Sequence, residues 1–180
     1  GLYRPETERD ACGVGFVAHV RGERSHEIVR QALTVLANLE HRGAVGADPL
    51  TGDGAGILMQ IPREALAPDL VGTACGVGML FLPQQAEARS ASIDLIDRTV
   101  REHGREVLGW RQVPVDPSVC GPLALSGMPE IQQVFVGRLA GESDESFERA
   151  LYIIRKAVER HSVEGLYVCS LSSRTIVYKG

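Results

Sequence analysis

The chain has 180 residues, of which 44% are hydrophobic and 23% charged, and its formal net charge is −4. This size and composition fit one globular domain, because a chain of this length buries roughly 70% of the surface that its unfolded form exposes. The mildly acidic balance and the few aromatic residues argue against nucleic acid or a membrane as partner, and no apolar run approaches the ~20 residues of a membrane span. Because the first residues lack the apolar centre of a signal peptide, we expect a cytoplasmic protein.

The amino-terminal part predicts a strand followed by a helix. Residues 12–20, "CGVGFVAHV", form the predicted strand and lead into the turn "RGER". From Ser25, a typical N-cap, apolar residues recur at helical spacing and predict an amphipathic helix that ends near Gly43. The apolar stripe of this helix consists of Ile28, Ala32, Leu33, Val35, Leu36 and Leu39.

The rest of the chain mixes strands and helices without a regular βαβ rhythm. The fully apolar residues 73–83 predict a central strand, and the last two strands, separated by Ser173 and Arg174, predict a hairpin. A loop is expected around Pro117, Pro122 and Pro129. The other elements are predicted strands over 55–62, 105–115, 129–139, 165–172 and 175–180, and predicted helices over 85–104 and from Ser143 or Asp144 onward. Short paired strands with long helices between the pairs indicate an α+β fold with mainly antiparallel sheets.

The four cysteines, Cys12, Cys75, Cys120 and Cys169, lie far apart in the sequence, with no CxxC pair and no clustered histidines. This spacing argues against a metal site encoded by the chain. We expect the last three to be buried small hydrophobes, as isolated cysteines in cytoplasmic proteins usually are. Cys12 stands between a polar segment and an apolar run, and it needs a separate explanation.

The loop over residues 41–57 is rich in glycine and charge. The glycines at 52, 54 and 56 could suggest a phosphate cradle, but a strand rather than a helix follows them, and Asp53 would repel an anion. The loop therefore does not predict a nucleotide site.

Three segments together resemble a known family. The segments are "CGVGFVA" from Cys12, "EHRGAVGAD" from Glu40 and "TGDGAGILMQIP" from Thr51. In order, residue identity and spacing they resemble the amidotransferase domain at the start of glutamate synthase large subunits. The first helix and the ending "CSLSSRTIVYKG" are similar as well, so the resemblance runs along the chain. It implies a class II (N-terminal-nucleophile) glutamine amidotransferase. The implied fold is a four-layer αββα sandwich of two mainly antiparallel sheets, which we expect to be incomplete in this chain.

The resemblance implies an enzymatic role for Cys12. The family releases ammonia from L-glutamine through a cysteinyl thioester, for glutamate synthesis from 2-oxoglutarate. In the family a short leader is removed, so we expect residues 1–11 to be a leader and residues 12–180 to be the amino-terminal portion of the amidotransferase domain. A first-position cysteine supplies both a thiol and a basic α-amine, whereas the nitrogen of an internal cysteine is a planar amide. The alternative is that Cys12 is a buried strand residue beside two glycines.

Two further residues are expected to support the site. By resemblance Arg42, in the "HRG" pattern, lies beside the nucleophile; the alternative is a solvated cation at a helix C-terminus. Asp53 either orients Arg42 or serves as a turn residue in its tight loop. His41 is interpreted as structural, because the α-amine of Cys12 would act as the base.

The remaining parts are expected elsewhere. The family's Asn-Gly oxyanion pair does not occur here, and we place it, with the residues that hold glutamine, in later segments. FMN and an iron-sulfur cluster are implied for the whole enzyme, and no cofactor for this segment. The implied partners are L-glutamine, the remaining synthase domains of the same polypeptide and a small reductase subunit. The alternative function is a non-catalytic interaction or relic domain with the same fold and a blocked thiol.

Overall fold

The structure is a computed structural model that describes residues 13–43, 48, 50–67, 69, 72–161 and 163–179. The chain divides into an amino-terminal unit (residues 1–57, 119–126 and 179–180) and a sheet unit (residues 58–118 and 127–178). Cys12 and the predicted leader, residues 1–11, lie outside the described residues.

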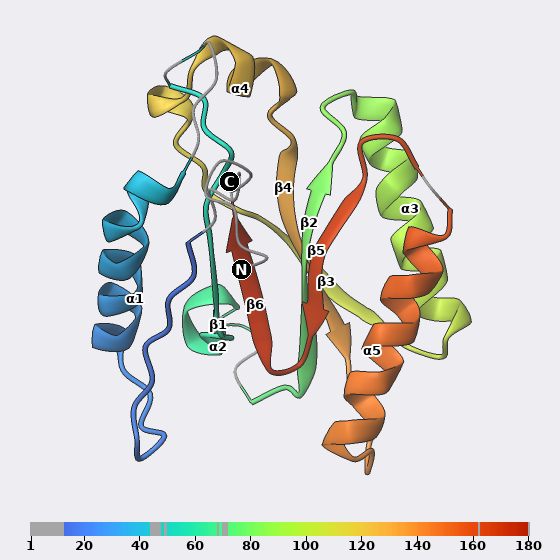
Figure 1. Ribbon diagram of the computed structural model, residues 1–180. Helices are drawn as coiled ribbons and strands as arrows, with labels where there is room; N and C mark the ends of the chain where they lie inside the picture. The colour runs from blue at the N-terminus through green and yellow to red at the C-terminus, as the bar shows by residue number, and fades with distance from the viewer. Residues whose placement is uncertain are drawn as a thin grey trace, which may run out of the picture. The chain divides into compact units, whose positions relative to one another are not determined.

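A four-stranded antiparallel sheet, in the order β3-β4-β2-β5, forms the centre of the sheet unit (Figure 1). Its strands are β2 (Cys75–Leu82), β3 (Val107–Gln112), β4 (Glu130–Gly137) and β5 (Tyr167–Ser172). In β2, Met79 lies opposite Gln133 of β4, and almost the whole strand is buried. The prediction of a central strand over 73–83 is therefore confirmed.

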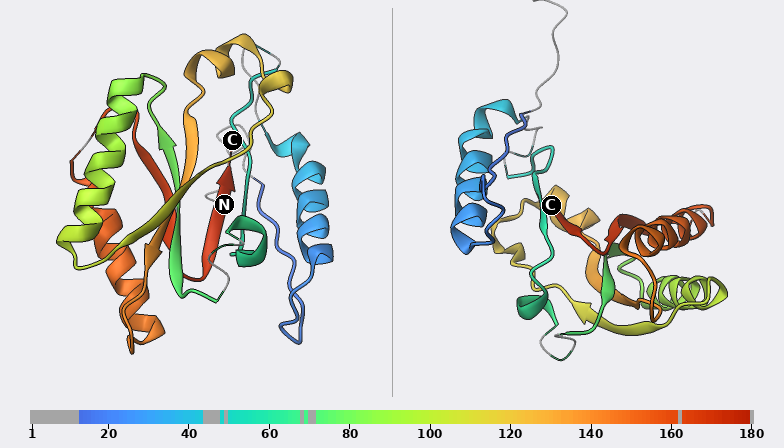
Figure 2. Two further views of the ribbon diagram at one scale, coloured as in Figure 1. Left: turned by 180° about the vertical axis from the view of Figure 1, so that it is seen from behind. Right: turned by 90° about the horizontal axis from the view of Figure 1, so that it is seen from below.

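Two helices, α3 (Ala86–Glu102) and α5 (Asp144–Glu159), cover one face of this sheet, and Figure 2 shows them on the same side. α5 begins as predicted, since the Ser143 hydroxyl accepts a hydrogen bond from Ser146 N (3.2 Å). Its apolar side chains recur at helical spacing and face the sheet. The core on this side consists of Leu80, Leu82, Ile96, Val100, Val134, Val136, Phe147, Leu151, Ile154, Val158 and Val168.

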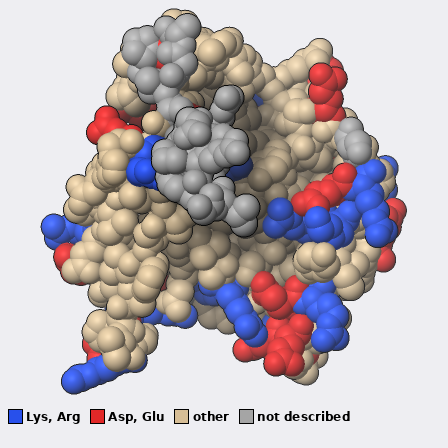
Figure 3. Space-filling model, in the orientation of Figure 1, with Lys and Arg blue, Asp and Glu red and all other residues tan. Residues whose placement is uncertain are grey.

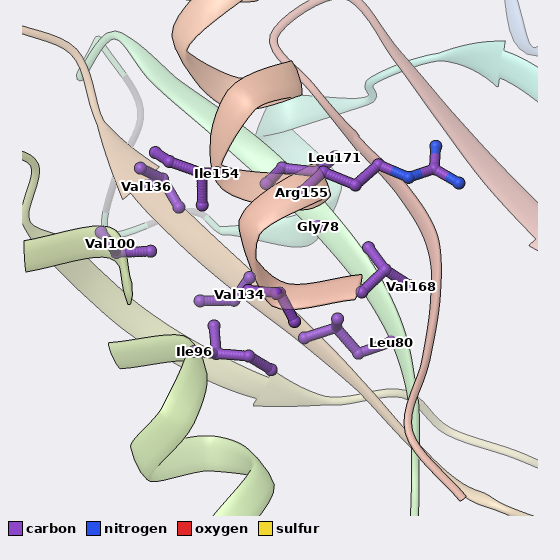
Figure 4. Close-up of a pocket in the computed structure, with 11 residues that line it drawn as sticks. Gly78, Leu80, Ile96, Val100, Val134, Val136, Ile154, Arg155, Val168 and Leu171 are labelled. Atoms are coloured by element: carbon purple, nitrogen blue, oxygen red, sulfur yellow. The ribbon is translucent and has the colours of Figure 1, made fainter. Parts of the chain in front are cut away.

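A small cavity remains inside this core. Figure 4 shows the apolar side chains around it, among them Val100, Val134 and Ile154. Arg155 is the charged residue of the lining, and its guanidinium points away from the apolar side chains and donates to Glu159 (Nε–Oε1 2.7 Å). An apolar lining of this kind is typical of a packing void rather than of a ligand site.

The opposite face of the sheet carries a two-stranded sheet of β1 (Gly56–Gln60) and β6 (Thr175–Lys179), together with the short helix α2 (Arg63–Leu66). Beyond the strands, Ile61 N donates to Arg174 O (3.2 Å), so the end of β1 meets the start of β6 and the pair is antiparallel. The second core consists of Ile61, Leu66, Cys75, Val77, Met79, Phe135, Cys169 and Ile176. The predicted α+β class with two antiparallel sheets is confirmed.

The predicted hairpin at the end of the chain is wrong. β5 and β6 follow one another in sequence but belong to different sheets, and the turn at Ser173 and Arg174 takes the chain from one sheet to the other. A carboxylate holds this turn, because Glu148 of α5 accepts hydrogen bonds from Ser173 N (2.9 Å) and Ser173 Oγ (2.6 Å). A short turn between two strands thus fits a crossing between layers as well as a hairpin.

The amino-terminal unit contains α1 (His26–Asn38) and the 3-10 helix η2 (Glu40–Arg42). The Ser25 hydroxyl accepts a hydrogen bond from Ile28 N (3.4 Å), so the predicted N-cap is confirmed. Leu33, which was expected in the apolar stripe, is 49% exposed, whereas the other members are half-buried.

Two other expectations about local structure are wrong. Residues 13–19 form no strand: Val14 and Phe16 are 94% and 92% exposed, and no ladder partner for this segment lies in the described part of the chain. An alternating apolar pattern makes a strand only when a neighbouring strand supplies its hydrogen bonds. The expected proline loop instead contains a 3-10 helix, η4 (Pro117–Val119), and α4 (Pro122–Gly127), because proline suits the first position of a helix.

Charges on the surface are mixed. On the face shown in Figure 3, acidic and basic side chains lie beside one another rather than in separate patches. On α5, for example, Glu159 pairs with both Arg155 and Lys156. No helix within the described ranges is both long and apolar enough to cross a membrane.

Candidate active site

The turn after α1 carries Arg42. Arg42 N donates to Leu39 O (2.8 Å) and Gly43 N donates to Glu40 O (3.0 Å), and these hydrogen bonds form η2. The ring of His41 meets the end of α1, with Nδ1 2.9 Å from Asn38 O. Since a carbonyl only accepts, Nδ1 carries the proton in this contact. His41 therefore has a structural contact at the helix end.

Gly13, the residue that follows Cys12 in the sequence, packs against this turn. A Cβ atom on Gly13 would lie 2.9 Å from Leu39 Cδ2 and 3.1 Å from Arg42 Cβ, so a larger residue requires the Leu39 side chain and the Arg42 stem to give way by a few tenths of an ångström. Cys12 itself lies outside the described residues. The structure thus brings the residue next to the predicted nucleophile into contact with the stem of Arg42.

Asp53 approaches the same turn from the glycine-rich loop. A Cβ atom on Gly43 would lie 3.4 Å from Asp53 Oδ1. The next residue, Gly54, has a φ of +87°, which favours glycine and turns the chain toward β1. The structure therefore places Asp53 beside the residue that follows Arg42.

The side chains of Arg42 and Asp53 are both exposed. Arg42 follows the C-terminus of α1, where the helix dipole favours a cation by about 0.3–1 kcal/mol. The site and the solvated-cation interpretations of Arg42 both stay open, as do the site and turn interpretations of Asp53.

Sequence reasoning missed Asp48, whose carboxylate accepts three hydrogen bonds. Its Oδ1 accepts from Leu50 N (3.1 Å), and its Oδ2 accepts from Thr51 Oγ1 (2.7 Å) and Leu123 N (3.3 Å). The Thr51 hydroxyl, followed by the Leu50 amide, holds the pKa of the Asp48 carboxyl below its ordinary value. The Asp-x-x-Thr spacing could have indicated the local turn, but no sequence signal indicates the bond to Leu123.

The described residues do not fit a metal or a cluster. No group of three or more His, Cys, Asp or Glu side chains among them could hold a metal ion. Cys75 and Cys169 are buried, as predicted, whereas Cys120 is only half-buried. These three cysteines are not clustered and so do not offer the set of thiolates that an iron-sulfur centre needs.

The structure has two stacked antiparallel sheets with helices on one face, and Gly13 packs against the turn that carries Arg42. This arrangement is consistent with an N-terminal-nucleophile hydrolase. More particularly, the chain belongs to the class-II glutamine amidotransferases, the family that matches residues 12–180.

Several named proteins are similar to this chain over almost its whole length. The chain is 46% identical over 190 residues to a protein of Bacillus subtilis named "Glutamate synthase [NADPH] large chain", and the match covers 100% of the chain and 12% of that protein. It is 46% identical over 183 residues to "Ferredoxin-dependent glutamate synthase 2" of Synechocystis, covering 96% of the chain and 12% of the relative. A chloroplastic ferredoxin-dependent glutamate synthase of rice is 46% identical over 188 residues, covering 97% of the chain and 12% of the relative. The expected resemblance is confirmed, and the chain spans about 12% of the length of these relatives.

Proposed function

We propose that this chain is the amino-terminal part of the ammonia-releasing domain of a glutamate synthase, in which glutamine supplies the nitrogen for glutamate formation from 2-oxoglutarate. The family match over residues 12–180 carries this proposal. The names of the three relatives described above support the proposal, because each is called a glutamate synthase.

In the proposed mechanism Cys12 is the nucleophile. Its sulfur attacks the side-chain amide carbon of glutamine while its α-amine takes the thiol proton. The α-amine then gives a proton to the departing nitrogen, the carbon–nitrogen bond breaks, and ammonia leaves behind a cysteinyl thioester. Water hydrolyses the thioester, which releases glutamate and restores the thiol.

This mechanism requires a free α-amine at Cys12. We propose that residues 1–11 are a leader and that cleavage between Ala11 and Cys12 exposes the amine. The start of the family match at Cys12 supports this boundary. An α-amine has an ordinary pKa of about 7.7–8.0 and can exchange a proton at cellular pH.

Arg42 and Asp53 are proposed to order the site. The contact between Gly13 and the Arg42 stem supports a role for Arg42 beside the nucleophile, and the approach of Asp53 to Gly43 supports a role for Asp53 in fixing the turn. We place the oxyanion donors in a further segment, because the sequence contains no Asn-Gly pair.

The rest of the reaction is proposed to occur in other domains of the same polypeptide. We propose that the FMN and the iron-sulfur cluster implied by the resemblance bind in those domains, and that a small reductase subunit is a partner. We also propose a cytoplasmic location, although the rice relative is named as chloroplastic.

The proposal is tested by replacing Cys12 in the mature full-length enzyme. We expect Cys12→Ser to abolish glutamate synthesis from glutamine and to leave synthesis from added ammonia unchanged, because only amide cleavage needs the thiol. Cys120→Ser is a matched control, since Cys120 is also a free cysteine of the amino-terminal unit. Retention of the glutamine-dependent rate in Cys12→Ser would favour the non-catalytic alternative, and equal loss of both rates would indicate a structural role for Cys12.

A further inference from the structure

Asp48 and Thr51 tie two distant segments of the amino-terminal unit together. Asp48 Oδ2 accepts from Leu123 N (3.3 Å), and Thr51 Oγ1 accepts from Ala124 N (3.2 Å). Gly121 N also donates to Leu50 O (3.2 Å). Three backbone amides of residues 121–124 therefore bond to residues 48–51, which lie more than 70 positions earlier in the sequence.

These contacts provide hydrogen-bond acceptors for the first backbone amides of α4. The first amides of a helix have no carbonyl partner within it, so they need acceptors from outside. Leu123 and Ala124 stand at the start of α4, and Asp48 and Thr51 supply the acceptors that a local N-cap residue would otherwise supply. A carboxylate is a strong acceptor for a backbone amide, because the bond is charge-assisted.

Close packing adds to this attachment. A Cβ atom on Gly121 would overlap the carboxylate of Asp48, so the two segments approach as closely as a glycine allows. Within its own loop, Asp48 is held by the Leu50 amide and by the Thr51 hydroxyl. The positions of Asp48 and Thr51 are thus fixed both by contacts within their loop and by contacts with residues 121–124.

The loop fixed in this way also carries Asp53. Asp53 follows Thr51 by two residues, and its Oδ1 approaches Gly43, which follows Arg42. The Arg42 stem in turn contacts Gly13, next to Cys12. Contacts and short stretches of chain therefore connect residues 121–124 to the turn that packs against Gly13, the residue after Cys12 in the sequence.

We propose that Asp48 and Thr51 are positioning residues of the glutamine-cleaving site, which anchor the loop of Arg42 and Asp53 to residues 121–124. This inference rests on the proposed function. Neither residue touches the substrate; both act by holding the loop, so their loss lowers the rate of amide cleavage and leaves the use of free ammonia intact.

The test uses the mature full-length enzyme with Asp48→Asn and Thr51→Val. The asparagine substitution keeps one carbonyl oxygen but loses an acceptor, and the valine substitution keeps the shape of threonine without its hydroxyl. We expect each to lower kcat for glutamine about 10- to 100-fold, because displacement of catalytic groups by less than 1 Å has effects of this size. Thr51→Ser keeps the hydroxyl and should stay within about threefold of wild type, since its acceptor is retained.

Asp116→Asn is the matched control. Asp116 is an exposed aspartate that also stands in a local turn, where its Oδ1 accepts from Ser118 N (3.0 Å), and hydrogen bonds from Ser118 lower its pKa as well. These hydrogen bonds stay within its own turn and reach no distant segment. We expect Asp116→Asn to change both rates by less than about twofold, as surface substitutions usually do.

Hydrogen exchange of the peptide over residues 75–82 in the same samples shows whether the domain stays folded. Wild-type protection of this peptide, with loss of glutamine-dependent kcat alone, supports the proposal. A Thr51→Val rate equal to that of Thr51→Ser, or loss of protection together with activity, overturns it. If Cys12→Ser remains active with glutamine, the proposed function fails and this inference with it; if only the Asp48 and Thr51 variants remain active, this inference fails alone.

Discussion

At position 13 a single hydrogen in place of a side chain allows the chain to contact Leu39 and Arg42. A methyl group there would require the Leu39 side chain and the Arg42 stem to move by a few tenths of an ångström, because Cβ contacts of 2.9 Å and 3.1 Å are closer than side chains normally approach. The packing of Arg42 against the residue that follows Cys12 therefore depends on this glycine.

We therefore predict that Gly13→Ala in the full-length enzyme lowers the glutamine-dependent rate about tenfold and leaves the ammonia-dependent rate unchanged. Gly127→Ala is the control, since a Cβ atom on Gly127 meets nothing within 4 Å. Initial rates with each nitrogen source measure the effect. If the two alanine variants cleave glutamine at the same rate, the packing of Gly13 has no role in the site.

The sequence indicates some residues of the candidate site and not others. Arg42 and Asp53 stand in a short continuous motif, so local spacing and family resemblance are enough to select them. Asp48 stands in the same motif, but its partner amide at Leu123, like the Ala124 amide bonded to Thr51, becomes a neighbour only after folding. Backbone amides carry no residue-specific signal, so the sequence alone could not predict these contacts.

At the level of whole elements, the reliable predictions are those with a strong local cause. α1 and α5 begin at serine N-caps and have apolar stripes at helical spacing, and β2 is an uninterrupted apolar run. Two of the errors, the strand over 12–20 and the terminal hairpin, concern pairing between strands. Pairing depends on a partner elsewhere in the chain, which a local pattern does not specify.

One ion pair joins two elements of the sheet unit. Arg105, just before β3, donates two hydrogen bonds of 2.5 Å to Glu142, just before α5, and the two side chains are only 6% and 8% exposed. The Arg105 guanidinium also lies 5.5 Å from the ring centre of Phe147. The hydrogen bonds from Arg105 are the main reason that the pKa of Glu142 falls to about 2.

We predict that Glu142→Gln lowers the free energy of unfolding of the chain by about 3–5 kcal/mol at neutral pH, because it leaves a buried guanidinium without its counter-charge. Glu102→Gln, which changes a 62% exposed carboxylate 3.9 Å from Arg98, is the control and should change it by less than about 0.5 kcal/mol. Urea unfolding followed by the fluorescence of Trp110, the single tryptophan, measures both. Equal effects of the two substitutions would contradict this role of the buried pair.

The same pair predicts a pH dependence. The pKa of Glu142 is lower in the folded chain, about 2, than its ordinary value of 4.5, so the folded state favours the ionised form. Its contribution to stability is complete above about pH 4.5 and is lost as the pH falls toward about 2. We expect the stability difference between wild type and Glu142→Gln to shrink across this range in urea unfolding series. A difference that stays constant with pH would show that charge is not its source.

Across the whole molecule, packing and candidate chemistry occur in different units. Both buried cores belong to the sheet unit, whereas Cys12, Arg42, Asp48 and Asp53 belong to the amino-terminal unit, in which α1 has no fully buried residue. Few buried apolar contacts mean low local stability. Specific hydrogen bonds and glycine contacts therefore have more influence on geometry here than in the sheet unit.

The last prediction concerns maturation of the whole chain. Two forms of the full-length enzyme should be compared, one beginning at Cys12 and one retaining residues 1–11. In the retained form the nitrogen of Cys12 is a planar amide without a basic lone pair, so the general base, worth about 10²–10⁴ in rate, is missing. We expect only the form that begins at Cys12 to release ammonia from glutamine, and both forms to make glutamate from added ammonia. Intact mass must establish the first residue of each sample, because slow cleavage between Ala11 and Cys12 would otherwise produce activity in the retained form. Glutamine cleavage at equal rates by two forms with verified masses would contradict the α-amine mechanism and leave the thiol to be activated by another base.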